Sequence, residues 1–149
     1  MLRISWVLVL GFLLAGGLGS AYAADQYGTP AEAKAMLEKV VGAIKQDEAK
    51  ALKMITAGED GFKEKDLYPF CAGPDGNFTA HPKLVGKSLA DLKDKSGKAF
   101  GKDIMDEAKE GKISEVTYMW PRPDGGDPVQ KVAYVTKVKD QVCAVGYYK

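Results

Sequence analysis

The spacing of apolar positions divides this chain into three parts. A predominantly apolar run, Ile4 to Leu18, opens it. Between residues 30 and 57, apolar residues recur three or four positions apart, which predicts amphipathic helices. From Leu67 onward, short apolar segments alternate with turn-forming residues. They predict strands at 67–72, 77–80, 114–120, 129–138 and 142–148, with one helix around 104–108.

The first part has the layout of a secretory signal peptide. Arg3 is the only charged residue before Asp25. The stretch ends at Ala21-Tyr22-Ala23, which has small residues at the two positions that signal peptidase recognises. An uncleaved anchor is the alternative, but a span takes about 20 apolar residues, and this run is shorter and contains glycines. We predict a signal peptide at 1–23, a single domain at 24–149, and a periplasmic or secreted location with no membrane span after cleavage.

Composition limits the partners of this domain. The chain has 21 Lys and Arg against 20 Asp and Glu, and the signal peptide holds one of the basic residues. Because the remaining charges cancel, no strong field attracts nucleic acid or an anionic membrane surface. Arg122 is the sole arginine after the signal peptide, so a forked, bidentate grip on a carboxylate is available at one place only.

The order of the predicted elements indicates an α+β fold. Two N-terminal helices, a hairpin closed by Pro74-Asp75-Gly76-Asn77, a crossover with a helix and three further strands follow one another. This order gives an antiparallel sheet of about five strands, with a long N-terminal helix and helices packed on one side. Thr29 and Glu32 are spaced as the capping box that starts the long helix.

The two cysteines lie in the first and last predicted strands. Cys71 and Cys143 form an even pair in an exported chain, which favours a disulfide. Such a bond would place the first strand beside the last. Two buried free thiols, or a catalytic cysteine paired with His81, are the alternatives.

Several motifs, taken in order, resemble the single-Cache (sCache) domain family. The hairpin ends in His81-Pro82, and segments VGKSL (85–89) and DKSG (94–97) follow. The chain then closes with Tyr118-x-Trp120, Lys131-x-x-Tyr134 and Gly146-x-Tyr148. The match runs over about residues 30–148. It implies a PAS-like fold with a pocket between the sheet and the segment that links its second and third strands.

The resemblance also implies a function. Cache domains are typically extracytoplasmic sensors of small molecules, often organic acids or amino acids, in chemoreceptors and histidine kinases. Lys149 follows the last predicted strand directly, so we expect a sensor-type binding domain without its own transducer module. A small carboxylate is the expected ligand, and a membrane receptor is a candidate protein partner.

Seven side chains are candidate ligand contacts. The family motifs single out Lys131 as the anion partner, Tyr134 beside it, and His81 as a second polar contact. Lys131 and Tyr134 point to opposite faces of a regular strand, and we assign Tyr134 to the face of Tyr118. A solvated lysine and a histidine that braces its own loop are the alternatives. The aromatic candidates, which fill core in the alternative interpretation, are Tyr118, Trp120, Tyr68 and Phe70.

The sequence gives little support for catalysis. One histidine, scattered carboxylates and the lack of a phosphate-binding or paired-cysteine motif predict no metal, no cofactor and no enzyme activity. The main hypothesis is therefore an extracytoplasmic ligand-binding domain. The alternative is a protein-interaction or structural envelope protein with a degenerate pocket.

Overall fold

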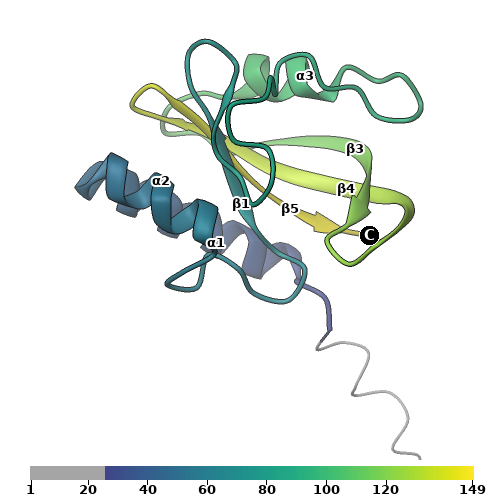
Figure 1. Cartoon of the computed structure of the whole chain (residues 1–149), viewed down its shortest axis with the longest axis horizontal. Helices are drawn as coiled ribbons and strands as arrows, with labels where there is room; N and C mark the ends of the chain where they lie inside the picture. The colour runs from purple at the N-terminus through teal and green to yellow at the C-terminus, as the bar shows by residue number, and fades with distance from the viewer. Residues whose placement is uncertain (1–25) are drawn as a thin grey trace, which may run out of the picture.

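The computed structural model describes residues 26–149. The signal peptide predicted at 1–23 lies outside these residues and stays a prediction, which N-terminal sequencing of the exported protein can test. Within 26–149, no helix is long and apolar enough to cross a membrane. The elements (Figure 1) are α1 (Pro30–Gln46), α2 (Glu48–Ala57), β1 (Pro69–Ala72), β2 (Phe78–Ala80), α3 (Phe100–Glu107), β3 (Ser114–Arg122), β4 (Gly125–Val138) and β5 (Gln141–Tyr148).

The five strands form one antiparallel sheet in the order β2-β1-β5-β4-β3. The first hairpin therefore pairs with the last strand, and the predicted α+β class is confirmed. Cys71 and Cys143 face each other in the β1–β5 register and are joined by the predicted disulfide.

Each of the two N-terminal helices is preceded by a residue whose side chain accepts a hydrogen bond from a free backbone N–H group in the first turn. The Thr29 side chain accepts from the N–H of Glu32, and the Glu32 carboxylate accepts from the N–H of Thr29. This confirms the predicted capping box. Asp47 then caps α2 by accepting from the N–H of Lys50, and Gly58 ends it in a left-handed conformation.

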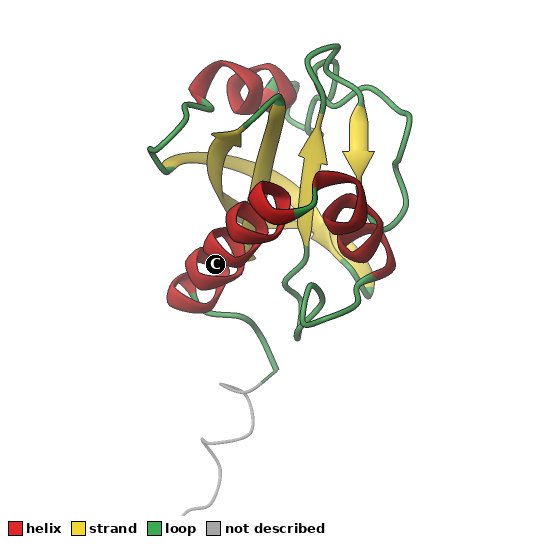
Figure 2. Ribbon diagram, turned by 90° about the vertical axis from the view of Figure 1, so that its left-hand side faces the viewer, coloured by secondary structure: helices red, strands yellow, loops and turns green. Residues whose placement is uncertain are grey.

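Each face of the sheet has its own core. Cys71, Cys143 and Val145 pack with the apolar faces of α1 and α2. Phe70, Tyr118 and other residues of the opposite face pack against α3 and the β2–β3 connection. Figure 2 shows α1 and α2 in front of the sheet and α3 at the upper left, away from them. The helical layer predicted on one side is thus α1 and α2, and α3 adds a cover on the other face.

The hairpin of β3 and β4 is longer than the sequence suggests. Residues 121–128 are rich in proline and glycine and read as a loop, but Arg122 pairs with Gly125 around the turn residues Pro123 and Asp124. Gly125 and Gly126 have φ of 97° and 93°, values that other residues rarely adopt. The strand therefore continues past Trp120 and brings Arg122 to Asp66, in the loop before β1.

Candidate functional site

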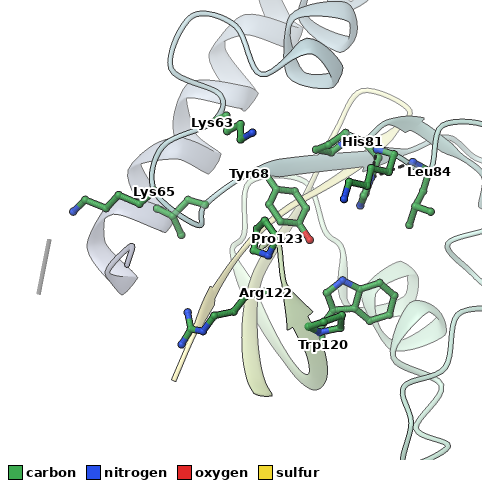
Figure 3. Close-up of a pocket in the computed structure, with 12 residues that line it drawn as sticks. Lys63, Lys65, Tyr68, His81, Leu84, Trp120, Arg122 and Pro123 are labelled. Carbon is green, nitrogen blue, oxygen red and sulfur yellow. Dashed lines mark hydrogen bonds between the residues drawn. The ribbon is translucent and has the colours of Figure 1, made fainter. Parts of the chain in front are cut away.

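A pocket of about 350 Å³ opens on the sheet face that carries Tyr118. Three segments meet around it: the loop before β1, the start of the β2–β3 connection, and the tip of the β3–β4 hairpin. This is the location that the family resemblance implies. Figure 3 shows Tyr68 between the side of the pocket formed by Lys65 and Arg122 and the side formed by His81 and Trp120. The lining residues are Lys63, Lys65, Leu67, Tyr68, His81, Pro82, Lys83, Leu84, Trp120, Pro121, Arg122 and Pro123.

The pocket lining carries charge of one sign. Four cations line it, and no Asp or Glu of the described chain does. Lys65 pairs with Glu32 at 2.7 Å and Arg122 with Asp66 at 2.5 Å, both outside the lining. Lys63 and Lys83 make no ion pair with any residue in 26–149. The pocket is therefore suited to an anion.

Arg122 is held in place from several sides. Its Nη1 donates to Asp66 Oδ2, and the two side chains are only 18% and 8% exposed. Its guanidinium carbon lies 3.9 Å from the ring centre of Tyr27 and 4.8 Å from that of Tyr148. An arginine in a proline- and glycine-rich loop reads as exposed in the sequence. The longer hairpin instead makes it a fixed part of the pocket rim.

Lys131 is fully buried directly behind Tyr68. Its Nζ donates to the Tyr68 hydroxyl at 3.1 Å, and it lies 4.2 Å and 4.9 Å from the ring centres of Tyr68 and Tyr148. No carboxylate of the described chain pairs with it. Gly146 makes room for its stem, because a Cβ there would lie 2.1 Å from the lysine Cε. Fully buried lysines are almost always paired, so this site lacks a negative partner.

The Tyr68 hydroxyl connects Lys131 with the pocket. Because it accepts from the lysine, it keeps its own proton for a second acceptor. The neighbouring Tyr148 hydroxyl donates to the Pro121 carbonyl at 2.8 Å. Burial, and then the proximity of Tyr68, raises the pKa of Tyr148. Tyr148 is therefore a neutral donor at ordinary pH.

His81 is fixed as a neutral donor. Its Nδ1 accepts from the N–H groups of Lys83 at 2.9 Å and Leu84 at 3.2 Å, so a neutral ring carries its proton on Nε2. Burial, followed by the charges of Lys131 and Lys83, lowers the pKa of His81 to about 4. The ring therefore braces its own loop, as one of the two interpretations predicts. Its Nε2 donates to no residue of the described chain.

The lowered pKa predicts how stability depends on pH. The unfolded histidine takes up a proton near pH 6.5, but the folded one does so only near pH 4. Stability is therefore full above about pH 6.5 and falls as the pH drops toward 4, by up to about 3 kcal/mol. Urea unfolding between pH 7.5 and about 5 measures this. His81→Asn keeps an acceptor near the Nδ1 position and cannot titrate. The free energy of unfolding of this variant should therefore depend less on pH. The same pH dependence of stability in both proteins would contradict the lowered pKa of His81, because His81 is the only histidine.

The aromatic candidates divide into two groups. Tyr68 and Trp120 line the pocket, whereas Phe70 and Tyr118 lie behind it around a gap of about 10 Å³. Tyr118 stacks on Phe100 with ring centres 4.0 Å apart, and its burial raises its pKa well above the ordinary value. Phe70 and Tyr118 thus fill the core at the back of the pocket.

The assignment of Tyr134 to the face of Tyr118 is wrong. Tyr118 pairs directly with Lys131 across β3 and β4, and directly opposed residues share a face. Tyr134 points to the other face, where it packs against the α1–α2 core with its ring centre 5.7 Å from that of Tyr147. Lys131, and not Tyr134, therefore belongs to the pocket side of the sheet.

Four charged residues near the pocket were not singled out from the sequence. Lys63, Lys65 and Lys83 are three of many lysines spread along the chain, and nothing in their spacing separates them from solvated ones. Asp66 is marked only by its place immediately before the apolar run at Leu67. Its partner Arg122 carried the stronger signal, as the one arginine outside the predicted signal peptide.

The sheet order and the helices define an α+β domain, and the pocket on one face of its sheet is lined by cations and no acidic residue of the described chain. The family model described as "Cache domain" (dCache_2) matches residues 33–148. The chain belongs to the Cache domain family, as its motifs predict.

Individual relatives agree with this family. The methyl-accepting chemotaxis protein McpP of Pseudomonas putida is 32% identical over 60 residues, which are 40% of this chain and 11% of that receptor. A periplasmic sensor domain of a chemotaxis protein has a TM-score of 0.64 at 22% identity, over 87% of this chain and 99% of its own. A Cache chemosensory domain, titled for its recognition of carboxylic acids, has a TM-score of 0.55 at 21% identity, over 77% and 84%. At these identities the two solved structures show a shared fold.

Proposed function

We propose that this Cache domain works outside the cytoplasm and binds a small organic acid in the pocket beside Tyr68. The observation that carries the proposal is the charge of the site. Four cations line the pocket without an acidic residue of the described chain, and the buried Lys131 behind Tyr68 has no carboxylate partner. A ligand carboxylate supplies the missing negative charge.

The donors of the site suit the oxygens of a carboxylate. The Tyr68 hydroxyl can donate its proton to a ligand, and the Nε2–H of His81 donates to no residue of the described chain. His81 is neutral at ordinary pH, so Lys131 and Arg122 supply the positive charge. Hydrogen bonds to an ionised acceptor are stronger than neutral ones, and a few such donors within apolar walls are typical of ligand pockets. Leu67, Leu84 and Trp120 form the apolar part.

The relatives support the same ligand class. One structural neighbour is titled for carboxylic acid recognition by a Cache chemosensory domain, and the curated relative is a chemotaxis receptor. A membrane receptor remains our proposed protein partner. That the domain is not an enzyme is likewise an expectation that fits the family.

A thermal-shift screen tests the proposal. Acetate, propionate, succinate and citrate at matched ionic strength form the test set, with acetamide and choline as neutral and cationic controls. A ligand at 100 times its Kd adds about 2.7 kcal/mol to the free energy of unfolding, which raises Tm by several degrees in a domain of this size. We expect at least one acid, and neither control, to produce such a shift.

The control variant separates the pocket from non-specific anion effects. Tyr68→Phe removes the hydroxyl at the centre of the pocket and should abolish the shift. A screen that is flat for all the acids would contradict the proposal. It would favour the alternative of a protein-interaction domain with a degenerate pocket.

A further inference from the structure

We infer that ligand binding is coupled, through the Arg122–Asp66 ion pair, to the attachment of the N-terminal segment at residues 27–29. This inference rests on the proposed function, since it concerns how the same pocket is regulated. It requires that one set of contacts joins the pocket rim to this segment, and the structure contains such a set.

Asp66 binds the pocket rim and the N-terminal segment at the same time. Its Oδ2 accepts from Arg122 Nη1 at 2.5 Å, and its Oδ1 accepts from the N–H of Gly28 at 2.7 Å. The ring of Tyr27 covers the Arg122 guanidinium at 3.9 Å. Arg122 itself lines the pocket. One carboxylate therefore connects a pocket cation with the backbone just before α1.

The neighbours of Asp66 strengthen this connection. Leu67 lines the pocket and packs so tightly on the backbone of Gly28 that a Cβ there would lie 2.1 Å from its Cγ. Lys65, also in the lining, binds the Glu32 carboxylate that caps α1. Three consecutive residues, of which Lys65 and Leu67 line the pocket, thus hold the segment and the start of α1, so the pocket wall and the segment are expected to move together.

The coupling has a defined direction. Asp66 keeps the guanidinium of Arg122 at the pocket rim; without Asp66, only the rings of Tyr27 and Tyr148 would hold it there. An anionic ligand gains more from the held arginine, so it favours the attached state of the segment. Because linkage is reciprocal, loosening the segment weakens ligand binding by the same factor.

The Gly28 amide reports the attachment directly, because its hydrogen bond to Asp66 is part of the connection. Hydrogen exchange of this amide is measured by NMR in the full-length protein, with and without saturating acetate or succinate. Exchange should slow by about tenfold, within the usual range of allosteric coupling. Asp66→Asn should remove this ligand effect and weaken binding of the same acid by a similar factor.

The controls separate the possible failures. Asp106→Asn removes the same charge from an exposed ion pair on α3 and should change neither quantity. If Asp66→Asn fails to fold, Tyr27→Ala, which removes only the ring over Arg122, should speed Gly28 exchange and weaken binding. Binding of an acid without a change at Gly28 would overturn the coupling and leave the proposed function intact. If neither acid binds, the proposed function fails and the coupling fails with it.

Discussion

Replacing Lys131 by methionine is expected to weaken organic-acid binding strongly without destabilising the fold. The ammonium group is fully buried, with one hydroxyl and two aromatic rings as its partners. A buried charge is costly to desolvate, and apolar residues of similar volume in place of buried ionic groups are often neutral or stabilising. A residue present only for stability would behave in the opposite way, because its removal would lower the free energy of unfolding.

The size of the binding loss follows from the chemistry of the site. Hydrogen bonds to charged groups contribute about 1.5–3 kcal/mol, and the methionine also leaves the Tyr68 hydroxyl without its donor. We therefore expect Kd for the best acid to rise by about 10- to 100-fold, measured by calorimetric titration beside urea unfolding. Lys137→Met, at an exposed position of the same strand, should leave both values unchanged. Unaltered binding in the Lys131 variant would show that the buried charge does not serve the ligand.

The sequence predicted most of the fold, because its signals are local. The capping box, the helical apolar spacing and the Pro-Asp-Gly-Asn turn all lie within a few residues of the elements that they start or connect. The disulfide then added one long-range contact, which placed β1 beside β5. Strand order at the centre of the sheet therefore followed from the two cysteines.

The error at Tyr134 has a physical origin in the hairpin turn. The proline- and glycine-rich stretch 121–128 read as a loop, and a loop of unknown geometry gives no register between the strands that it joins. The turn is in fact Pro123-Asp124, which pairs Arg122 with Gly125. Turn length fixes hairpin register, and counting back from that turn would place Val129 opposite Tyr118. A register shift between Trp120 and Arg122 moves the partner by two residues to Lys131, which lies on the same face. Tyr134 cannot share that face.

The ion pair at the pocket rim could not be predicted in the same way. Asp66 and Arg122 are 56 residues apart, and no motif connects them. They meet because β5 lies between β1 and β4, so that the loop before β1 reaches the tip of the neighbouring hairpin. Contacts of this kind depend on the assembled sheet, which explains why the cationic rim became visible only in the structure.

The second large effect is expected from the disulfide. Cys71→Ala combined with Cys143→Ala should lower the free energy of unfolding by as much as about 4 kcal/mol. The bond closes a loop with a sequence separation of 72, and its loss returns that loop entropy to the unfolded chain. Both cysteines are fully buried in the core against α1 and α2, so two small cavities add to the cost.

The same variant separates stability from binding. The disulfide lies on the face of the sheet opposite to the pocket, and the β1–β5 backbone pairing remains without it. The Kd of the acid should therefore change by less than about threefold at temperatures where the variant is folded, because distant sites act nearly independently. Urea unfolding with and without reductant supplies the control, since reductant should destabilise the natural protein and leave the alanine variant unaffected. Equal stability of the two proteins under oxidising conditions would show that the bond contributes nothing to the fold. A large loss of affinity in a fully folded variant would instead show that the two faces of the sheet are coupled.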